Sequence, residues 1–376
     1  MTRNPSKAKN GFPHFMLKEI YEQPDAVRRV IAGRIDAQSR IVLPGLGFSQ
    51  EEIRDISKIT VAASGSSRHA GIVGEFMLER MTGLPVEVDF ASQYCYRDPV
   101  VVPHELTIFL SQSGTTIDTI TALNVARRKG GRSLAICNVP DTPLIQNADT
   151  ALLTYAGEEV AIAATKSFTT QLTALFLLAA FIGQTRGRTE IQKAVAALTV
   201  LPESIGEALT TDAECQKFAQ LLYRYKDFIY LGRDIDYPIA LEGALKLKEI
   251  SYIHAEGYPT GELKHGPTAL VHEGLPLVVL AAHDKDDPDS MLRYSKTVSN
   301  IREFLEREIP VLAIVNESDK EITALTPCVL PVPDVPVLLQ PIVEVVPLQL
   351  LAYHIAVLCG RNVDQPRHLS KSVVIE

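Results

Sequence analysis

Short apolar runs alternate with amphipathic helical patterns through the first half of this chain. Each of four such runs predicts a buried strand: 59–63, 85–88, 106–109 and 133–138. Apolar residues three and four apart lie between them and predict helices, one of which starts at Thr116 and ends at Gly130. Strands that alternate with helices of this length predict an α/β fold with a parallel, doubly wound sheet.

The same pattern restarts in the second half. A long helical region begins at Thr165 and is followed by runs that predict three more strands, 228–232, 275–280 and 310–315. Gly65 and Gly232 mark equivalent strand ends 167 residues apart, and Ser111 and Ala281 mark a second pair 170 residues apart. Two landmarks with nearly the same offset indicate two copies of one α/β unit.

The repeat predicts how the chain is divided. We expect a disordered leader over residues 1–14, N-terminal helices with a first domain over 15–205, a second domain over 206–364, and a C-terminal tail over 365–376.

The loop Ser111-Gln112-Ser113-Gly114-Thr115-Thr116 separates a predicted strand from a predicted helix. Hydroxyls and backbone N–H groups at a helix N-terminus form an anion site, and phosphate is its usual occupant. The alternative is an ordinary strand–turn–helix joint capped by serine. Ser64–Ser67 follow another strand of the same copy, and ligands of open α/β sheets bind beyond the carboxyl ends of strands. One small anion that touches both loops is therefore expected, and only in the first copy, because the second has Ala281–Asp284 instead.

Composition and charge exclude several classes of protein. Apolar content of 46% and charged content of 22% are those of a soluble globular protein. A net charge of −8 without a basic patch argues against a nucleic-acid partner. The apolar stretch 172–183 is too short to span a bilayer, and the polar N-terminus is not a signal peptide. Five scattered cysteines without a CxxC pair indicate free thiols, so we expect a cytoplasmic protein with no membrane partner.

Several blocks of the sequence resemble one known family. They are residues 16–24, 111–114, 163–171, 240–250, 261–267 and 365–373. From about residue 15 to residue 376 the chain is similar to the isomerase half of the glucosamine-6-phosphate synthases, or glutamine–fructose-6-phosphate aminotransferases. The resemblance implies two tandem SIS (sugar isomerase) domains, which agrees with the repeat. It also implies a homodimer whose active site is shared between subunits, and neither a cofactor nor a metal.

The resemblance also raises the question of the nitrogen source. Members of this family have an N-terminal glutaminase domain whose first residue is a catalytic Cys, whereas the first Cys here is Cys95. We therefore expect no glutamine hydrolysis by this chain, with ammonia taken from solution or from a separate glutaminase partner.

The implied substrates are fructose 6-phosphate with ammonia and, in the reverse direction, glucosamine 6-phosphate. By the resemblance, the phosphate is held by the Ser111 loop, through Ser111, Gln112, Ser113 and Thr116. Ser66 and Ser67 contact the sugar and phosphate, although plain helix capping is an alternative for both. Further substrate contacts are implied for Ala164, Thr165 and Ser370.

Four residues are implied in catalysis. Glu249 moves a proton between C1 and C2 of the sugar, from a helix whose largely apolar pattern would desolvate its carboxyl and make it a better base. Lys246 lies three residues earlier on the same helix face and tunes Glu249 or binds sugar hydroxyls; the alternative is a surface salt bridge. His265 opens the sugar ring, from a loop that reaches the neighbouring subunit's site. Lys371 forms a Schiff base with the open-chain ketose, on a tail that acts as a lid.

The sequence departs from the family pattern near these residues. Ser64-Gly65-Ser66-Ser67 stands where the family usually has Cys-Gly-Thr-Ser, and Thr115 stands where Glu is usual. Ala164 and Ser370 stand where Ser and Ala are common. Three other hypotheses therefore stay open: a glucosamine-6-phosphate deaminase, the separated half of a two-part synthase, and a non-catalytic phosphosugar sensor.

Overall fold

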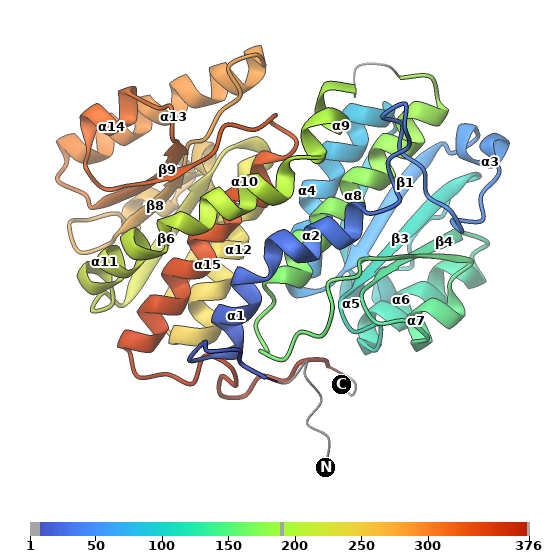
Figure 1. Ribbon diagram of the computed structural model, residues 1–376, viewed down its shortest axis with the longest axis horizontal. Coiled ribbons are helices and arrows are strands. Elements are labelled where there is room, and N and C mark those ends of the chain that lie inside the picture. Colours follow the sequence, from blue (N-terminus) through green and yellow to red (C-terminus); the bar gives the residue numbers. More distant parts are fainter. Residues whose placement is uncertain (1–7, 189–191, 374–376) are drawn as a thin grey trace. The chain divides into compact units, whose positions relative to one another are not determined.

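Two five-stranded sheets organise the part of the chain that the structure describes, residues 8–188 and 192–373 of a computed structural model (Figure 1). Every pairing between the named strands is parallel. Residues 1–7 of the predicted leader and the last three residues of the predicted tail lie outside the described residues.

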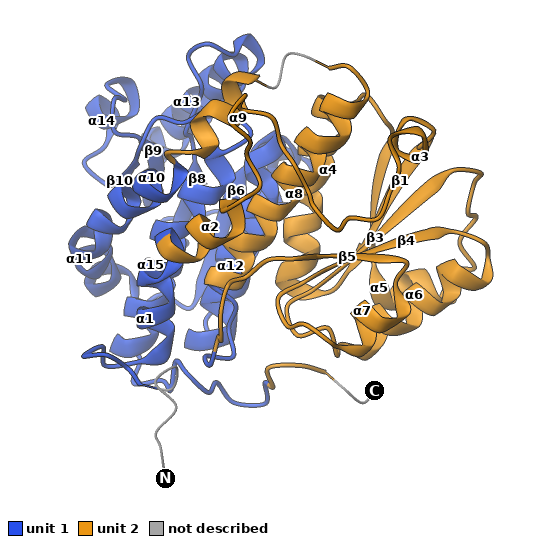
Figure 2. Cartoon of the chain, turned by 45° about the vertical axis from the view of Figure 1, so that its right-hand side comes forward, with its two compact units in different colours: residues 1–24, 160–165, 201–369 blue, residues 25–159, 166–200, 370–376 orange. Residues whose placement is uncertain are grey.

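The chain forms two compact units, and each is assembled from separate pieces of sequence (Figure 2). Unit 1 takes residues 1–24, 160–165 and 201–369, and unit 2 takes residues 25–159, 166–200 and 370–376. The boundaries expected near residues 205 and 364 stay a prediction about where the domains divide.

Unit 2 contains the first sheet, in the order β2-β1-β3-β4-β5. Its strands are β1 (Lys58–Ala63), β2 (Val86–Phe90), β3 (Glu105–Ser111), β4 (Arg132–Cys137) and β5 (Thr150–Leu153). The helices are α2 (Gln23–Ile31), which begins at the boundary with unit 1, α3 (Gln50–Arg54), α4 (Gly65–Thr82), α5 (Ala91–Tyr96), α6 (Ile117–Arg128), α7 (Pro143–Asn147), α8 (Lys166–Thr185) and α9 (Gln192–Leu198). All seven residues of β3 are buried, as expected for a central parallel strand between helical layers.

The register of this sheet places two loops together. Ala63 of β1 is the register partner of Leu110 of β3, so the two strands end at the same level. The loops that follow, at Ser64 and at Ser111, therefore leave the same edge of the sheet side by side. This is the edge at which open α/β sheets bind ligands.

Unit 1 contains the second sheet, in the order β10-β9-β8-β6-β7. Its strands are β6 (Asp227–Gly232), β7 (His254–Pro259), β8 (Leu277–Leu280), β9 (Val311–Asn316) and β10 (Val329–Val332). The α-helices are α1 (Phe15–Tyr21), α10 (Leu201–Ala208), α11 (Asp212–Leu222), α12 (Tyr237–Ser251), α13 (Pro288–Glu306), α14 (Glu321–Leu325) and α15 (Gln340–Leu358). The described part of the unit also contains the 3-10 helices η2 (Leu209–Thr211), η3 (Asp234–Asp236), η4 (Thr260–His265) and η5 (Pro267–Leu270).

The two sheets have the same strand topology. Read from its β7 edge, the second sheet runs β7-β6-β8-β9-β10, which matches β2-β1-β3-β4-β5 strand for strand. The prediction of two copies of one parallel, doubly wound α/β unit is confirmed.

The helical region predicted from Thr165 to about residue 206 is formed, in its described residues, by the helices α8, α9 and α10. Helix α8 ends at Thr185, because Gly187 adopts φ +80° and the Arg188 N–H turns back to the carbonyl of Gly183 at 2.9 Å.

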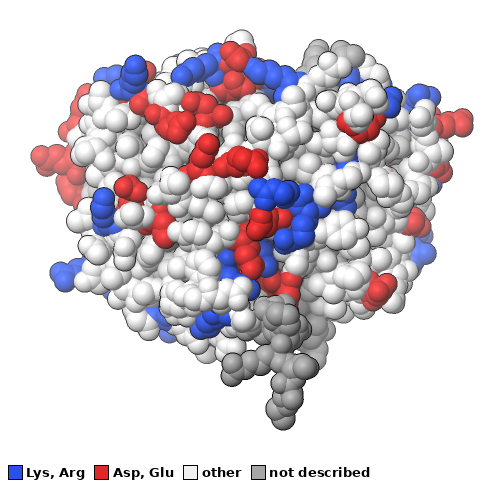
Figure 3. Space-filling model, viewed as in Figure 1, with Lys and Arg blue, Asp and Glu red and all other residues white. Residues whose placement is uncertain are grey.

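Helices α8 and α15 are long and apolar enough to cross a membrane by length and composition alone. In both, however, 83% of the most apolar window is buried inside the protein, as in core helices of soluble proteins. The sequence shows no basic patch. On the face drawn in Figure 3, positive and negative side chains are interspersed.

Candidate functional site

The Ser111 loop of unit 2 is folded by its own hydroxyl groups. Ser111 ends β3, and its Oγ accepts the Gly114 N–H at 3.0 Å and lies 3.2 Å from Oγ1 of Thr116. Thr116 is the N-cap residue of α6, yet its side chain makes no capping hydrogen bond. Thr116 thus does not cap α6 through its side chain, and the anion site stays a prediction.

Gly114 is required at the centre of this loop. Its φ is +66°, and a Cβ added there would lie 2.1 Å from Oγ1 of Thr142 and 2.8 Å from Sγ of Cys137. The loop thus packs tightly against the segment that follows β4. Gln112, between the two serines, is half-buried, and its carbonyl accepts the N–H of Asn138 at 3.2 Å.

Ser66 and Ser67 lie inside the first turn of α4, whose N-cap residue is Ser64. Oγ of Ser67 accepts a hydrogen bond from Nε2 of Gln171 at 3.0 Å. Gln171 comes from α8, and its side chain is buried. A buried amide thus orients Ser67, a contact that the sequence analysis missed.

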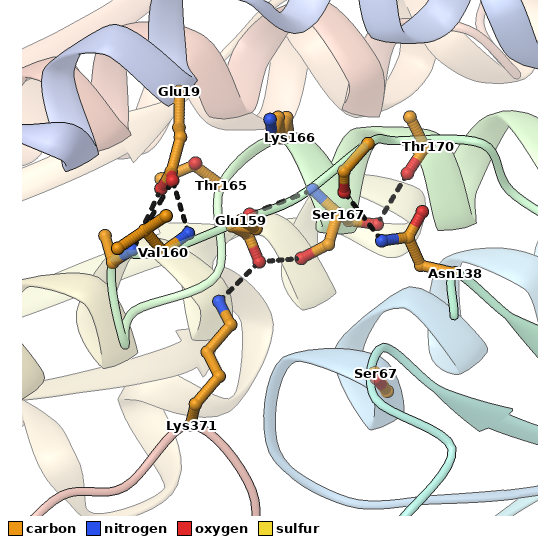
Figure 4. A network of polar contacts seen from close by, with 12 residues as sticks. Glu19, Ser67, Asn138, Glu159, Val160, Thr165, Lys166, Ser167, Thr170 and Lys371 are labelled. Atoms are coloured by element: carbon orange, nitrogen blue, oxygen red, sulfur yellow. Dashed lines mark hydrogen bonds and ion pairs between the residues drawn. The ribbon is translucent and has the colours of Figure 1, made fainter. Parts of the chain in front are cut away.

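The C-terminal tail docks on unit 2 through Lys371. Its Nζ lies 2.6 Å from Oε2 of Glu159, whose side chain is fully buried (Figure 4). The same carboxylate accepts the Ser167 hydroxyl at 2.6 Å and the Ser167 N–H at 3.1 Å. Glu159 is therefore fixed by the first turn of α8, and in turn it fixes the predicted Schiff-base lysine. On the same tail, the exposed Ser370 donates its hydroxyl to the carbonyl of Ser372 at 3.0 Å.

In unit 1, a buried glutamate holds the segment with Ala164 and Thr165. Glu19 of α1 accepts the Val160 N–H at 2.5 Å and the Ala161 N–H at 3.3 Å (Figure 4). Thr165 is fully buried, whereas Ala164 is half-buried.

Lys246 of α12 is buried between two carboxylates. Its Nζ lies 2.5 Å from Oε2 of Glu249 and 3.4 Å from Oε1 of Glu242. The side chains of Lys246 and Glu242 are fully buried, and that of Glu249 is 23% exposed. Burial alone would lower the pKa of the Lys246 ammonium, but the two carboxylates outweigh it and raise that pKa above its ordinary value. This ion pair is therefore not the surface salt bridge that the sequence left open.

Glu249 is the partly exposed member of this cluster on α12, and Lys246 holds its carboxylate. The Glu249 side chain is mostly buried, with 23% of it exposed, and its role as a base stays a prediction. His265, in unit 1 as well, closes η4 and is exposed.

The predicted residues are divided between the two units. Those of unit 2 are Ser66, Ser67, Ser111, Gln112, Ser113, Thr116, Ser370 and Lys371, and those of unit 1 are Ala164, Thr165, Lys246, Glu249 and His265. Sequence reasoning missed Glu159 and Glu242. Glu242 could have been found from its (i, i+4) spacing to Lys246, whereas nothing in the sequence links Glu159 to Lys371.

Comparison with known proteins gives a consistent picture. The family model described as SIS domain matches the chain twice, over residues 52–181 and 221–359. The glutamine–fructose-6-phosphate aminotransferase [isomerizing] of Clostridium acetobutylicum is 46% identical over 371 residues, and that of Thermus thermophilus is also 46% identical. Each alignment covers 98% of this chain, which spans 60% of the length of these curated relatives.

Solved structures show the same likeness. The C-terminal domain of glucosamine-fructose-6-phosphate aminotransferase from Francisella tularensis superposes with a TM-score of 0.87 and 38% identity, over 96% of this chain and 100% of that domain. A glucosamine-6-phosphate deaminase from Thermotoga maritima, with a TM-score of 0.73 and 21% identity over 96% of this chain and 100% of its own, shares the fold.

Proposed function

This chain belongs to the SIS-domain family, and on that premise we propose that it is a sugar-phosphate isomerase and aminotransferase module. Its substrates are fructose 6-phosphate and ammonia, and its product is glucosamine 6-phosphate. The relatives from Clostridium and Thermus bear the name of this activity, and they support the proposal over the part of their length that this chain spans.

One observation carries the proposal: a lysine amine is docked in the same unit as an anion loop. Lys371 is held by Glu159, and its neighbour Ser372 contacts Ser113 of the loop at 3.0 Å. A phosphate bound by Ser111, Ser113 and Thr116 would thus leave the rest of a short sugar chain near an amine. Ketone carbonyls react with such amines to form imines.

The first chemical steps follow from the residues in place. His265 removes the proton of the anomeric hydroxyl while the ring oxygen gains a proton, and the open-chain ketose results. Lys371 gives one ammonium proton to Glu159, its amine then attacks the C2 carbonyl, and loss of one water molecule gives an imine. Ammonia then adds at C2 and releases the Lys371 amine, which leaves the nitrogen on the sugar.

The last step moves a proton between neighbouring carbons. The Glu249 carboxylate takes a proton from C1 and returns one to C2, while the proton of the C1 hydroxyl passes to the imine nitrogen, so that the C2 imine becomes an amine and the C1 alcohol becomes an aldehyde. Lys246 remains charged beside Glu249 and holds its carboxylate in place. Each of these steps is reversible. The deaminase hypothesis therefore uses the same residues and differs only in the direction of the reaction that is favoured.

The partners belong to the same proposal. We place the protein in the cytoplasm, and all five of its cysteines, which lie in the described ranges, are free. A homodimer would bring the exposed His265 of one protomer to the site of its partner. Ammonia would come from solution or from a separate glutaminase protein.

The test uses purified protein, fructose 6-phosphate and ammonium chloride, with glucosamine 6-phosphate measured by chromatography. Borohydride added with fructose 6-phosphate should reduce the imine and leave a hexitol phosphate adduct on Lys371, found by peptide mass spectrometry. The variant Lys371→Arg keeps the charge and should show no adduct. The absence of both product and adduct in the wild type would overturn the proposal and favour the sensor hypothesis. A second arm, glucosamine 6-phosphate alone with ammonia release measured, gives the direction.

A further inference from the structure

The side-chain amide of Asn138 binds an irregular segment of unit 2 (Figure 4). Asn138 directly follows β4, and residues 154–159, which we call the strap, form neither a helix nor a strand. Oδ1 of Asn138 accepts the Ala156 N–H at 2.7 Å and the Thr154 hydroxyl at 3.3 Å. Nδ2 of the same amide donates to the carbonyl of Gly157 at 2.8 Å. Both ends of the amide are therefore used on the strap.

The strap needs such contacts because its backbone adopts an unfavourable conformation. Tyr155 has φ +50° and Gly157 has φ +78°, so both lie in the left-handed region. A residue other than glycine stays in that region only where the surrounding structure holds it. Arg29 contributes by donating to the carbonyls of Tyr155 and Ala156 at 3.0 and 2.9 Å. Asn138 supplies partners for backbone groups that no helix or strand pairs.

The strap ends at the carboxylate that holds Lys371. Glu159 lies two residues after Gly157, and its Oε2 meets Nζ of Lys371 at 2.6 Å. Ser167 orients the carboxylate itself, whereas Asn138 holds the backbone from which Glu159 projects. Displacement of a positioning contact by about 1 Å can slow a reaction roughly 100-fold. The conformation of the strap therefore matters for the placement of the lysine.

We propose that Asn138 is a positioning residue for the reaction of Lys371. It holds the strap, the strap places the Glu159 carboxylate, and the carboxylate aligns the amine that attacks the sugar carbonyl. The inference rests on the proposed function, which gives that amine its substrate. The backbone N–H of Asn138 donates to the carbonyl of Gln112 in the Ser111 loop at 3.2 Å, a contact that a change of the side chain leaves in place.

Asn138→Ala should therefore separate lysine alignment from anion binding. The variant removes the partner of the Ala156 N–H and of the Gly157 carbonyl, so the strap loosens. Borohydride trapping of Lys371 by fructose 6-phosphate should become about tenfold slower. The affinity for inorganic phosphate, measured by titration calorimetry, should stay within about twofold of the wild-type value, because the backbone contact with the Ser111 loop remains.

Acetylation of Lys371 by acetic anhydride measures the same alignment without any sugar. The nitrogen that is bonded to Glu159 is shielded from the reagent, so the wild type should be labelled slowly. In Asn138→Ala the pair loosens, and labelling should be about fivefold faster. Peptide mass spectrometry of the full chain gives both rates.

A double-mutant cycle tests whether Asn138 acts through Glu159. In a Glu159→Gln background the carboxylate is already absent, so Asn138→Ala should slow trapping by less than about a further twofold. The same tenfold effect of Asn138→Ala in both backgrounds would overturn the proposal, because Asn138 would then act by another route.

Gly157→Ala disturbs the strap while Asn138 stays intact, because φ is +78° and a side chain there is strained. Trapping and labelling should change as they do in Asn138→Ala. Gly130→Ala is one matched control, since φ is +80° and nothing lies within 4 Å of the new Cβ. Asn147→Ala is the other, since that amide donates to a carbonyl of its own helix at 2.7 Å. Both controls should behave as the wild type does.

The proposal and the proposed function can fail separately. Trapping at the wild-type rate in Asn138→Ala and Gly157→Ala leaves the function standing and overturns the role of Asn138. A phosphate affinity that falls in parallel with trapping would also overturn it, because unit 2 as a whole would then be disturbed. A wild type that forms no adduct, although both variants speed the labelling of Lys371, removes the function and leaves Asn138 as the residue that places the lysine.

Discussion

The ammonium of Lys371 and the carboxylate of Glu159 meet at 2.6 Å although 212 residues separate them in the sequence. Glu159 itself is held by Ser167 at the start of α8, so the lysine is aligned by the framework of unit 2. The tail would otherwise be a short polar segment, of the kind that is usually mobile.

We expect Glu159→Gln to weaken this alignment. The amide can still accept the Ser167 hydroxyl, but the charge-assisted bond to Lys371 is lost, and such bonds contribute about 1.5–3 kcal/mol. The rate of borohydride trapping should therefore fall roughly 10- to 100-fold. Ser167→Ala is the informative companion: it should lower the rate less, because the carboxylate remains. Trapping at the wild-type rate in Glu159→Gln would show that the pair does not position Lys371.

Removal of the charge of Lys246 should destabilise the protein. Lys246→Met leaves Glu242 fully buried without its cation, and breaking a buried pair costs roughly 3–5 kcal/mol. The free energy of unfolding is measured by urea denaturation. The double variant Glu242→Gln with Lys246→Met should recover much of that loss and yet remain inactive, which separates the structural role from the catalytic one. Equal stability of the single and double variants would argue against the pairing.

Two buried carboxyls of unit 1 should make stability depend on pH. Burial raises the pKa of Asp236 from 3.8 to about 8, and burial together with the charge of Asp236 raises the pKa of Glu344 well above its ordinary value. Between pH 4 and pH 8 the native Asp236 therefore keeps a proton that the unfolded chain releases. The free energy of unfolding should fall as pH rises through this window, by up to about 1.4 kcal/mol per pH unit for each such group.

Urea midpoints at pH 5 and pH 8 check this dependence. Asp236→Asn cannot ionise, so its midpoint should change less between the two pH values and should exceed that of the wild type at pH 8. Glu273→Gln, at an exposed position of the same unit, should keep the wild-type slope. An unchanged slope in Asp236→Asn would contradict the raised pKa.

Gly114→Ala should damage the anion loop. The added Cβ meets Thr142 at 2.1 Å while φ is +66°, so the loop must shift. Phosphate affinity, measured by titration calorimetry, should fall about tenfold or more. Gly130→Ala is a matched control, because φ there is +80° and nothing lies within 4 Å of the new Cβ. It should cost roughly 1–2 kcal/mol of stability through backbone strain alone and leave phosphate affinity unchanged. If Gly114→Ala and the wild type bind phosphate with equal affinity, the anion binds elsewhere.

A shared dimeric site predicts complementation between inactive variants. His265→Asn and Lys371→Ala should each be inactive alone. After the two are mixed and allowed to exchange subunits, half of the dimers are mixed, and each mixed dimer has one intact site. Activity should therefore return to about a quarter of the wild-type value. A mixture that stays inactive, although native mass spectrometry shows mixed dimers, would mean that each protomer supplies its own His265.

The sequence predicted the sheets better than the contacts between distant residues. Strands β1, β3, β4, β6 and β9 are mostly apolar, so local composition determines them. Strand β7 has the sequence HAEGYP and lacks that signal, and it forms because β6 pairs with it in parallel register. Helix α15 was not predicted as an element, because it is buried nearly all round and contains Pro347, and thus lacks an amphipathic period.

In the candidate site, too, local features were predicted and contacts between distant residues were not. The Ser111 loop was found because small polar residues interrupt a strand–helix junction at one place in the sequence. Glu159 and the contact between Thr115 and Ser372 arise only when the tail returns to unit 2, and no local pattern encodes that return.

The return of the tail also has a consequence for synthesis of the protein. Ser113 and Ser372 are 259 residues apart, so a ribosome that adds about 5–20 residues per second needs roughly 10–50 s to pass from one to the other. During that interval the nascent chain can form the first sheet and its anion loop, with all of the hydroxyls that later bind the tail exposed to water. The contact between the Ser111 loop and the tail can therefore form only after the last few residues of the chain have been translated.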